Sequence, residues 1–159
     1  MLYGASAFNQ ADLGWCIATT VVTTDAFTGS GCASSACGVR TSCHFTIKAD
    51  LVTAVDLWTS NKNSALTQYG EIAKWDVSAV DDMADLFLHK TGFNDDITGW
   101  DVSSVTTMYN MFRNTPAFNQ PIGVWDVSSL TRMDAMFRDS AFNQDISAWD
   151  VCVRCAEIK

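Results

Sequence analysis

The segment "WDVSSVTTMYNMF", residues 100–112, decides the architecture because the chain repeats it with variations. Four tryptophans and three phenylalanines mark the period: Trp75, Trp100, Trp125 and Trp149, and Phe93, Phe118 and Phe142. Successive tryptophans are 25, 25 and 24 residues apart. A unit of that length cannot enclose its own apolar side chains, so it must stack on copies of itself. The period therefore predicts a solenoid.

The pattern within a unit predicts one short strand followed by one short helix or 3₁₀ turn. In "ITGWDVSS", the residues Ile97, Trp100 and Val102 have the spacing of L-x-x-L-x-L, which in leucine-rich repeats is a short strand with alternate side chains turned inward. The next apolar residues recur at intervals of three and four, like one face of a helix: Val105, Met108, Met111 and Phe112. The predicted fold class is therefore α/β, a solenoid of short parallel strands and short helices.

The combination of "WDVSSVTTMYNMF" with "AFNQPI" resembles a known repeat. It is similar to the repeat of BspA-like surface proteins and of the related mycoplasma surface-lipoprotein repeats. The resemblance covers about residues 71–151, as three full units and the start of a fourth. It implies a leucine-rich-repeat-like solenoid and a cell-surface or secreted role, often adhesion, and it implies no catalytic residues.

Three segments are expected along the chain. They are the end of a repeat array with a Cys-rich closing unit at 1–45, an amphipathic helical cap at 46–70, and the array of about 25-residue repeats at 71–159. The opening "MLYGASAFNQ" matches "MFRNTPAFNQ" at 111–120. Leu51, Val55 and Trp58 form a helical stripe, and Gly70 stands where a helix would stop. We expect a longer parent chain, with neighbouring arrays as partners.

Six cysteines need an explanation: Cys16, Cys32, Cys37, Cys43, Cys152 and Cys155. Four of them lie within 28 residues, in a stretch rich in Gly, Ser and Thr, which predicts disulfide staples in a capping unit without a full core. Zinc and reduced structural thiols are the alternatives. The spacing is not that of two C-x-x-C pairs, and only His44 and His89 could supplement the thiolates. For "CVRC" at 152–155 a disulfide, or a thiol whose partner lies beyond this segment, is favoured over a redox pair.

Composition excludes several classes of function. Eighteen acidic and ten basic residues give a net charge of −8, which repels nucleic acid and anionic lipid. No apolar run is long enough for a membrane span, and the first residues do not resemble a signal peptide, so we expect a soluble chain without membrane insertion. Two histidines offer little for a catalytic triad. We therefore expect no enzyme and no cofactor.

Two columns of repeated polar residues remain. Asn94, Asn119 and Asn143 each follow a phenylalanine and are predicted to form an amide ladder between coils, and Asp76, Asp101, Asp126 and Asp150 are predicted to form an exposed acidic column. Carboxylates on neighbouring coils would lie about 4.8 Å apart, so each needs a donor, a cation or a basic partner. We expect local hydrogen bonds from the following Ser78, Ser103 and Ser128, with calcium as the alternative and no specific metal site.

Two functions are consistent with these features. The first is a non-enzymatic recognition module of a larger extracellular or cell-surface protein, which binds a protein or a glycan. The second is a structural spacer or assembly component with no ligand of its own.

Overall fold

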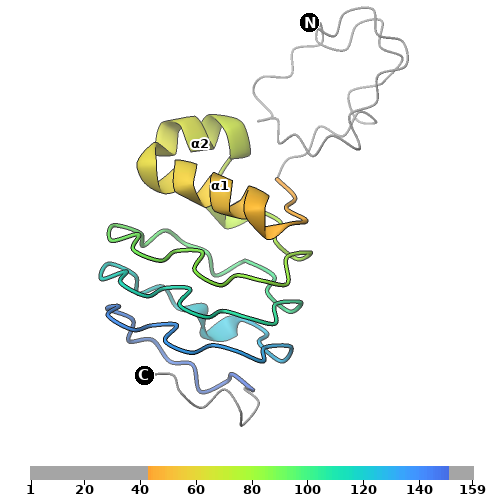
Figure 1. The fold of residues 1–159 in the computed structure, drawn as a ribbon, viewed down its shortest axis with the longest axis vertical. Helices are drawn as coiled ribbons and strands as arrows, with labels where there is room; N and C mark the ends of the chain where they lie inside the picture. The colour runs from red at the N-terminus through yellow and green to blue at the C-terminus, as the bar shows by residue number, and fades with distance from the viewer. Residues whose placement is uncertain (1–42, 151–159) are drawn as a thin grey trace, which may run out of the picture.

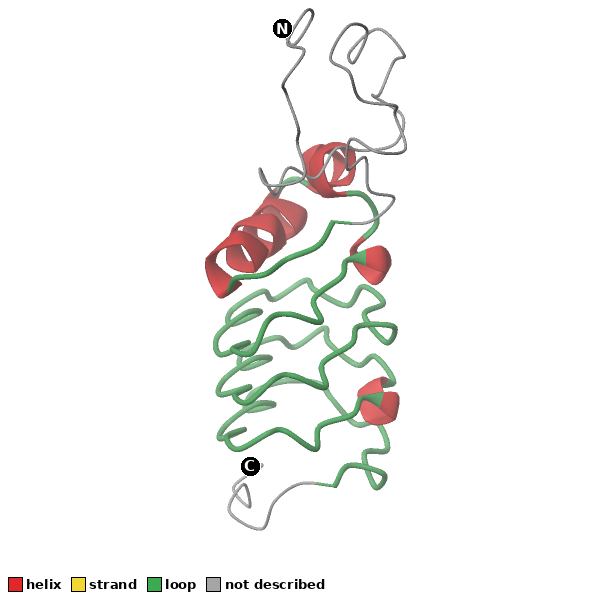
Figure 2. Cartoon of the chain, turned by 90° about the vertical axis from the view of Figure 1, so that its right-hand side faces the viewer, coloured by secondary structure: helices red, strands yellow, loops and turns green. Residues whose placement is uncertain are grey.

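The computed structural model describes residues 43–150, which form a stack of coils covered at one end by two helices (Figure 1). Helix α1 spans Lys48–Ser60 and helix α2 spans Lys62–Tyr69. Two single-turn 3₁₀ helices, η3 at Ile72–Lys74 and η4 at Ile122–Val124, lie on one side of the stack (Figure 2). Neither α1 nor α2 is long and apolar enough to cross a membrane.

Both helices lie in the segment expected to be the cap, and one residue joins them. The stripe of α1 is buried, as Leu51, Val55 and Trp58 lie in the core. Asn61 ends α1, where its N–H donates to the carbonyl of Leu57. Its side chain then accepts a hydrogen bond from the N–H of Ser64 and so caps α2. The two helices are therefore packed together as a hairpin over the first coil.

Each coil turns at equivalent residues. The first coil covers 72–96, the second 97–121 and the third 122–145. In the first, the N–H of Trp75 donates to the carbonyl of Ile72 at 3.2 Å, and the other two coils repeat this bond at 3.1 Å. A second turn joins Val80 to Val77 at 2.9 Å, again with equivalents in both later coils. These are the i to i+3 bonds of β-turns, so the repeat fixes the corners of the stack.

The predicted strands are wrong for the described residues. Residues 43–150 contain no strand, only isolated parallel bridges that join His44 to Asp76, and Thr107 to Asp82 and Arg132. The backbone at the tryptophans is extended, but φ is about −65°. That value lies nearer to polyproline II than to a parallel strand, so the N–H and C=O groups do not align with those of the next coil.

The predicted helices in the repeats are also wrong, because this part of each coil is a run of turns. Asp85, Asn110 and Ala135 each have a φ between 53° and 62°, at the third position of a turn closed by an i to i+3 bond. A positive φ at this position is characteristic of type II and type I′ turns. A run of turns and a helix can bury side chains at the same intervals along the sequence. Met108 and Met111 are therefore in the core although no helix forms.

Alternate peptide units of these turns connect the coils. The N–H groups of Met83, Asp85, Phe87 and His89 donate to the carbonyls of Thr107, Tyr109, Met111 and Arg113 at 2.9 to 3.0 Å. The next coil repeats the pattern, with Met108 donating to Arg132 at 2.8 Å. The C=O of Thr107 and the N–H of Met108 belong to one peptide unit. This unit therefore accepts from the coil before it and donates to the coil after it.

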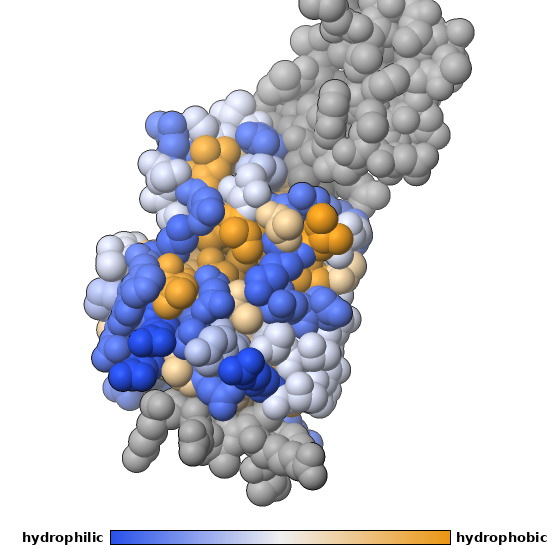
Figure 3. All heavy atoms as spheres, viewed as in Figure 1, coloured by the Kyte–Doolittle hydropathy of each residue, from blue (hydrophilic) through white to orange (hydrophobic). Residues whose placement is uncertain are grey.

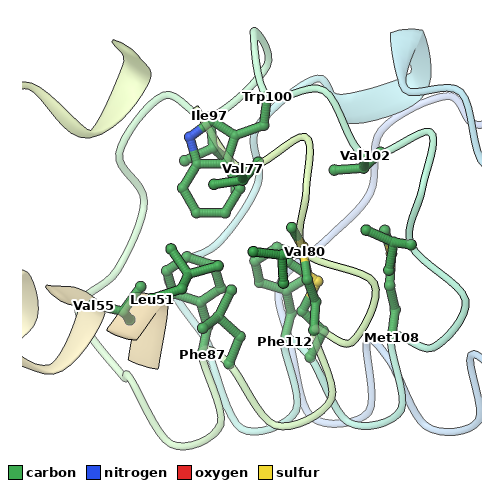
Figure 4. Packing of buried hydrophobic residues seen from close by; sticks show 14 of the residues in the cluster. Leu51, Val55, Val77, Val80, Phe87, Ile97, Trp100, Val102, Met108 and Phe112 are labelled. Carbon is green, nitrogen blue, oxygen red and sulfur yellow. The ribbon is translucent and has the colours of Figure 1, made fainter. Parts of the chain in front are cut away.

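The interior is a stack of aromatic and aliphatic side chains. Figure 4 shows residues of the first two coils and of α1 pointing into one interior. The rings of Phe87 and Phe112 are stacked with centroids 5.2 Å apart, and those of Phe112 and Phe118 are 3.8 Å apart. On the face drawn in Figure 3, hydrophobic surface gathers around the cap and its junction with the array, and the lower coils are mainly hydrophilic.

Candidate functional site

The acidic column is held by local hydrogen bonds. One carboxylate oxygen of Asp101 accepts from the N–H and the hydroxyl of Ser103, at 3.1 and 2.7 Å. Asp76 makes the same two bonds with Ser78, and the carboxylate of Asp126 accepts from the N–H of Ser128. Asp150, Asp101 and Asp126 are exposed, and Asp76 is half-buried. This geometry uses the carboxylates to close turns.

Hydrogen bonding affects the charge of this column. Burial raises the pKa of Asp76, but bonds from Ser78 and from Nδ1 of His44, at 2.7 Å, outweigh it and hold the pKa below its usual value. Donation from Ser128 lowers the pKa of Asp126. Asp76 and Asp126 are therefore stabilised in their charged form.

Sequence reasoning missed a second set of such turns. Asp96 accepts from the N–H and hydroxyl of Thr98, and Asp145 accepts from the N–H of Ser147. These bonds lower the pKa of both carboxyl groups. The spacing Asp-x-Ser/Thr is the same as in Asp-Val-Ser, and this signal would have located the second set.

The asparagine column forms an amide ladder. The side-chain oxygen of Asn94 accepts from the backbone N–H of Asn119 at 2.8 Å, and that of Asn119 accepts from the N–H of Asn143 at 2.9 Å. The amide of Gln120 adds a bond to the carbonyl of Asn94 at 2.7 Å. These side chains satisfy backbone donors of the following coil, so their geometry is structural.

Five of the six cysteines lie outside the described residues, and the prediction that they form disulfides falls outside them as well. Cys43 is described and is buried beside the first coil, where its carbonyl accepts from the N–H of Asp76 at 2.7 Å. No disulfide joins two residues of 43–150, since this range contains one cysteine. Within the same range no three His, Cys, Asp or Glu side chains are grouped as metal ligands.

A groove at the junction of cap and array is the main candidate for a ligand site, and the sequence did not predict it. This cap groove has a volume of about 1000 Å³. It is lined by the end of α1, the start of α2 and a loop of the first coil: Asp56, Trp58, Thr59, Ser60, Lys62, and residues 89–95. The helical hairpin thus meets a loop about 30 residues further along the chain.

Ion pairs hold the walls of the cap groove. Lys90 pairs with Asp56 at 2.6 Å, which ties the loop to α1. Asp95 pairs with Lys62 and accepts from the indole nitrogen of Trp58 at 2.9 Å. Lys62 also lies over the Trp58 ring, 4.8 Å from its centroid. Each of these charged groups therefore already has an oppositely charged partner in the groove wall.

His89 stands at the edge of the cap groove with one ring nitrogen already bonded. Its Nδ1 lies 3.0 Å from the side-chain nitrogen of Asn114, which is a donor, so Nδ1 accepts. In the neutral ring the proton is then on Nε2. His89 has a φ of 61°, like Asn114 and Asp139 in the equivalent turns, so its backbone conformation belongs to the repeat.

These observations define a repeat protein whose coils are joined by stacked aromatic rings and shared peptide units. The chain belongs to the family described as "Mycoplasma protein of unknown function, DUF285", whose family model matches residues 56–156. This match begins in α1 and includes all three coils. No curated protein matches the chain, and neither does any solved structure.

Proposed function

We propose that the chain is a non-enzymatic recognition module of a larger surface or secreted protein, and that its ligand binds in the cap groove. The observation that carries the proposal is the meeting of α1, α2 and the loop 89–95 around a space of about 1000 Å³. Binding sites commonly occur at such junctions, as concave regions with a few placed polar groups. The resemblance to BspA-like surface repeats supports the extracellular or cell-surface location.

The rigidity of the groove supports binding. The Lys90–Asp56 and Lys62–Asp95 pairs order side chains that would otherwise lose rotamer freedom when a ligand binds. Both Asp56 and Lys62 remain more than half exposed, so they are accessible to a ligand. A preorganised and accessible set of polar groups is what a recognition site requires.

A structural spacer is the second candidate, and one observation favours it. The repeated polar residues of the coils bond locally or to the next coil, as Asp101 does to Ser103 and Asn94 to Asn119. Polar groups used in this way stabilise a stack and select no ligand. The spacer function predicts that the chain binds no ligand specifically at the cap groove, so that filling the groove changes no measured binding.

A paired substitution tests the proposal on the full 159-residue chain. Binding is measured to surfaces coated with mucin, which is heavily glycosylated, and with gelatin, a polypeptide nearly free of glycan. Thr91→Trp fills the groove, and Ser129→Trp puts the same side chain at an exposed site in the third coil. We expect saturable binding to at least one surface, weakened about tenfold, or about 1.4 kcal/mol, by Thr91→Trp alone. Absent or equally affected binding would support the spacer.

A further inference from the structure

The charges of the cap groove balance. Its lining contains two lysines and two aspartates, and each lysine is paired with one aspartate. An anion would have to compete with Asp56 for Lys90, and a cation would have to compete with Lys90 for Asp56. Breaking either pair leaves a charged group without its partner, so neither kind of ion gains much by entering. The electrostatics therefore favour a neutral ligand.

The large apolar side chains of the groove are almost fully buried. Trp58 and Phe93 are its large apolar residues, and each is only 3% exposed. The ring of Trp58 also lies beneath the ammonium group of Lys62. A ligand that binds mainly by burying apolar surface would gain little here, because the hydrophobic effect scales with the area removed from water.

The loop backbone offers little to an added peptide strand. The N–H of Thr91 donates to the carbonyl of His89 at 2.9 Å, and the N–H of Phe93 donates to the carbonyl of Lys90 at 3.0 Å. Recognition of a strand depends on a row of unpaired N–H and C=O groups at an edge. These turn bonds occupy the donors of Thr91 and Phe93 and so interrupt the row, which leaves the main contacts to side chains.

The side chains provide both donors and acceptors. Asp56 and Asp95 can accept, and Lys62, Lys90 and the Nε2–H of His89 can donate. All five residues line one groove. The hydroxyls of Thr59 and Ser60 donate to α1 carbonyls and keep lone pairs that can accept. A vicinal pair of hydroxyl groups fits such a surface, because each hydroxyl can donate to a carboxylate while it accepts from an ammonium group.

From these four features we infer that the cap groove binds a neutral carbohydrate, through side chains that contact adjacent hydroxyl groups. The inference rests on the proposed function and names the ligand class for the same site. A monosaccharide with about a dozen non-hydrogen atoms at ordinary ligand efficiency has a dissociation constant on the order of 1 mM. A longer saccharide that follows the open groove binds more tightly.

The experiment uses the full chain and four probes: the methyl glycosides of glucose, galactose, mannose and N-acetylglucosamine. Each is titrated to tens of millimolar while the indole N–H resonance of Trp58 is followed by NMR, since that N–H bonds to Asp95 in the groove wall. We expect at least one glycoside to shift the resonance saturably. Sodium sulfate and phenol, as anionic and apolar probes, should produce no saturable shift.

Two variants and a matched control locate the binding. Asp56→Asn removes one carboxylate and the partner of Lys90, and Thr91→Trp fills the space; each should weaken glycoside binding at least about tenfold. Asp101→Asn changes an exposed carboxylate of the second coil and should leave the affinity unchanged. The use of two groove variants keeps the test valid if one of them folds poorly.

The outcomes separate the two proposals. If no glycoside binds but the groove still mediates binding to gelatin, the carbohydrate inference is wrong and the recognition function is retained. The same conclusion follows if sulfate or phenol shifts the resonance saturably. If a glycoside binds equally to the Asp56→Asn and Asp101→Asn variants, the assigned location is wrong. If neither a coated surface nor any glycoside binds, both proposals fail.

Discussion

The indole nitrogen of Trp100 donates a hydrogen bond of 2.8 Å to the backbone carbonyl of Ile72, in the preceding coil. The same bond joins Trp125 to Ile97 at 3.2 Å and Trp149 to Ile122 at 3.3 Å. Each tryptophan therefore fills the core and also satisfies a buried carbonyl of its neighbour. This double role explains why a tryptophan, not another large apolar residue, recurs with the period of the coils.

The first prediction concerns this bond. Trp100→Ala should lower the free energy of unfolding by about 3 to 5 kcal/mol, because it leaves a cavity between two coils. Trp100→Phe retains most of the packing and removes the indole bond to the Ile72 carbonyl, which keeps its bond from the N–H of Trp75, so it should cost only about 0.5 to 1.5 kcal/mol. Urea unfolding measures both. The control, Val124→Ala at a side chain that is 78% exposed, should change stability by less than about 0.5 kcal/mol. If Trp100→Ala unfolded at the same urea concentration as the wild type, Trp100 would not hold the neighbouring coils together.

A second prediction tests the amide ladder. Asn94→Ala removes the acceptor for the backbone N–H of Asn119 and should cost about 0.5 to 1.5 kcal/mol. Asn94→Asp keeps an acceptor oxygen and should be nearly neutral. Hydrogen exchange at the Asn119 amide should quicken in the alanine variant. Asn63→Ala, at an exposed position of α2, is the control, and an equal loss there would show that the ladder contributes nothing specific.

The third prediction concerns a close approach of two backbones. A Cβ atom at Gly123 would overlap the carbonyl oxygen of Asp145 in the following turn. Gly123→Ala should therefore cost about 1 to 3 kcal/mol, since backbone has to move. Gly99 lies in the corresponding corner of the second coil, where the nearest atom to a new Cβ is 3.7 Å away. Gly99→Ala should stay within about 0.5 kcal/mol of the wild type by thermal melting; similar melting of the two variants would contradict the packing at Gly123.

A fourth prediction follows from the lowered pKa of Asp76. A carboxyl group whose folded pKa lies below its unfolded value of about 4 stabilises the fold above that value. This stability is lost as the pH falls through the lower, folded pKa. Urea midpoints at pH 7, 5, 4 and 3 should decline less steeply below about pH 5 for Asp76→Asn than for wild type.

Asp81→Asn, at an exposed position of the same coil, is the control for this titration and should retain the wild-type decline. Parallel declines for all three proteins would show that the bonds from His44 and Ser78 do not stabilise the charged form of Asp76 in solution.

The fifth prediction concerns the cysteines. We expect the four at residues 16–43 to be oxidised in the native protein, because the surrounding segment is poor in large apolar residues. Alkylation followed by mass spectrometry, with and without reductant, measures this. Rapid alkylation of all four in undenatured protein would indicate a reducing compartment and oppose the proposed extracellular location.

The repeat period was sufficient to predict that the units stack and that Trp100 and Phe118 are buried. The physical reason is local: a 25-residue unit has more apolar surface than it can enclose, whatever its backbone does. The Asp-x-Ser turns were predictable for a related reason. Asp101 and Ser103 are two residues apart, so their hydrogen bond forms without help from distant parts of the chain.

The backbone of the repeat depended on the tertiary structure. A helix and a run of turns bury the same positions, such as Met108 and Met111, so the apolar spacing cannot distinguish them. The turns prevail because their alternate peptide units bond to the neighbouring coils, and an isolated unit has no such partner. The asparagines at 110 and 114 were a local sign of left-handed turns, but the apolar spacing masked it.

The cap groove depended entirely on long-range contacts. Asp56 meets Lys90 across 34 residues, and Trp58 meets Asp95 across 37. None of these residues belongs to the repeated pattern, so the period gave no reason to associate them. Side chains that a repeat brings together can be inferred from spacing, whereas those brought together by docking a helical cap on a coil are known only after the chain has folded.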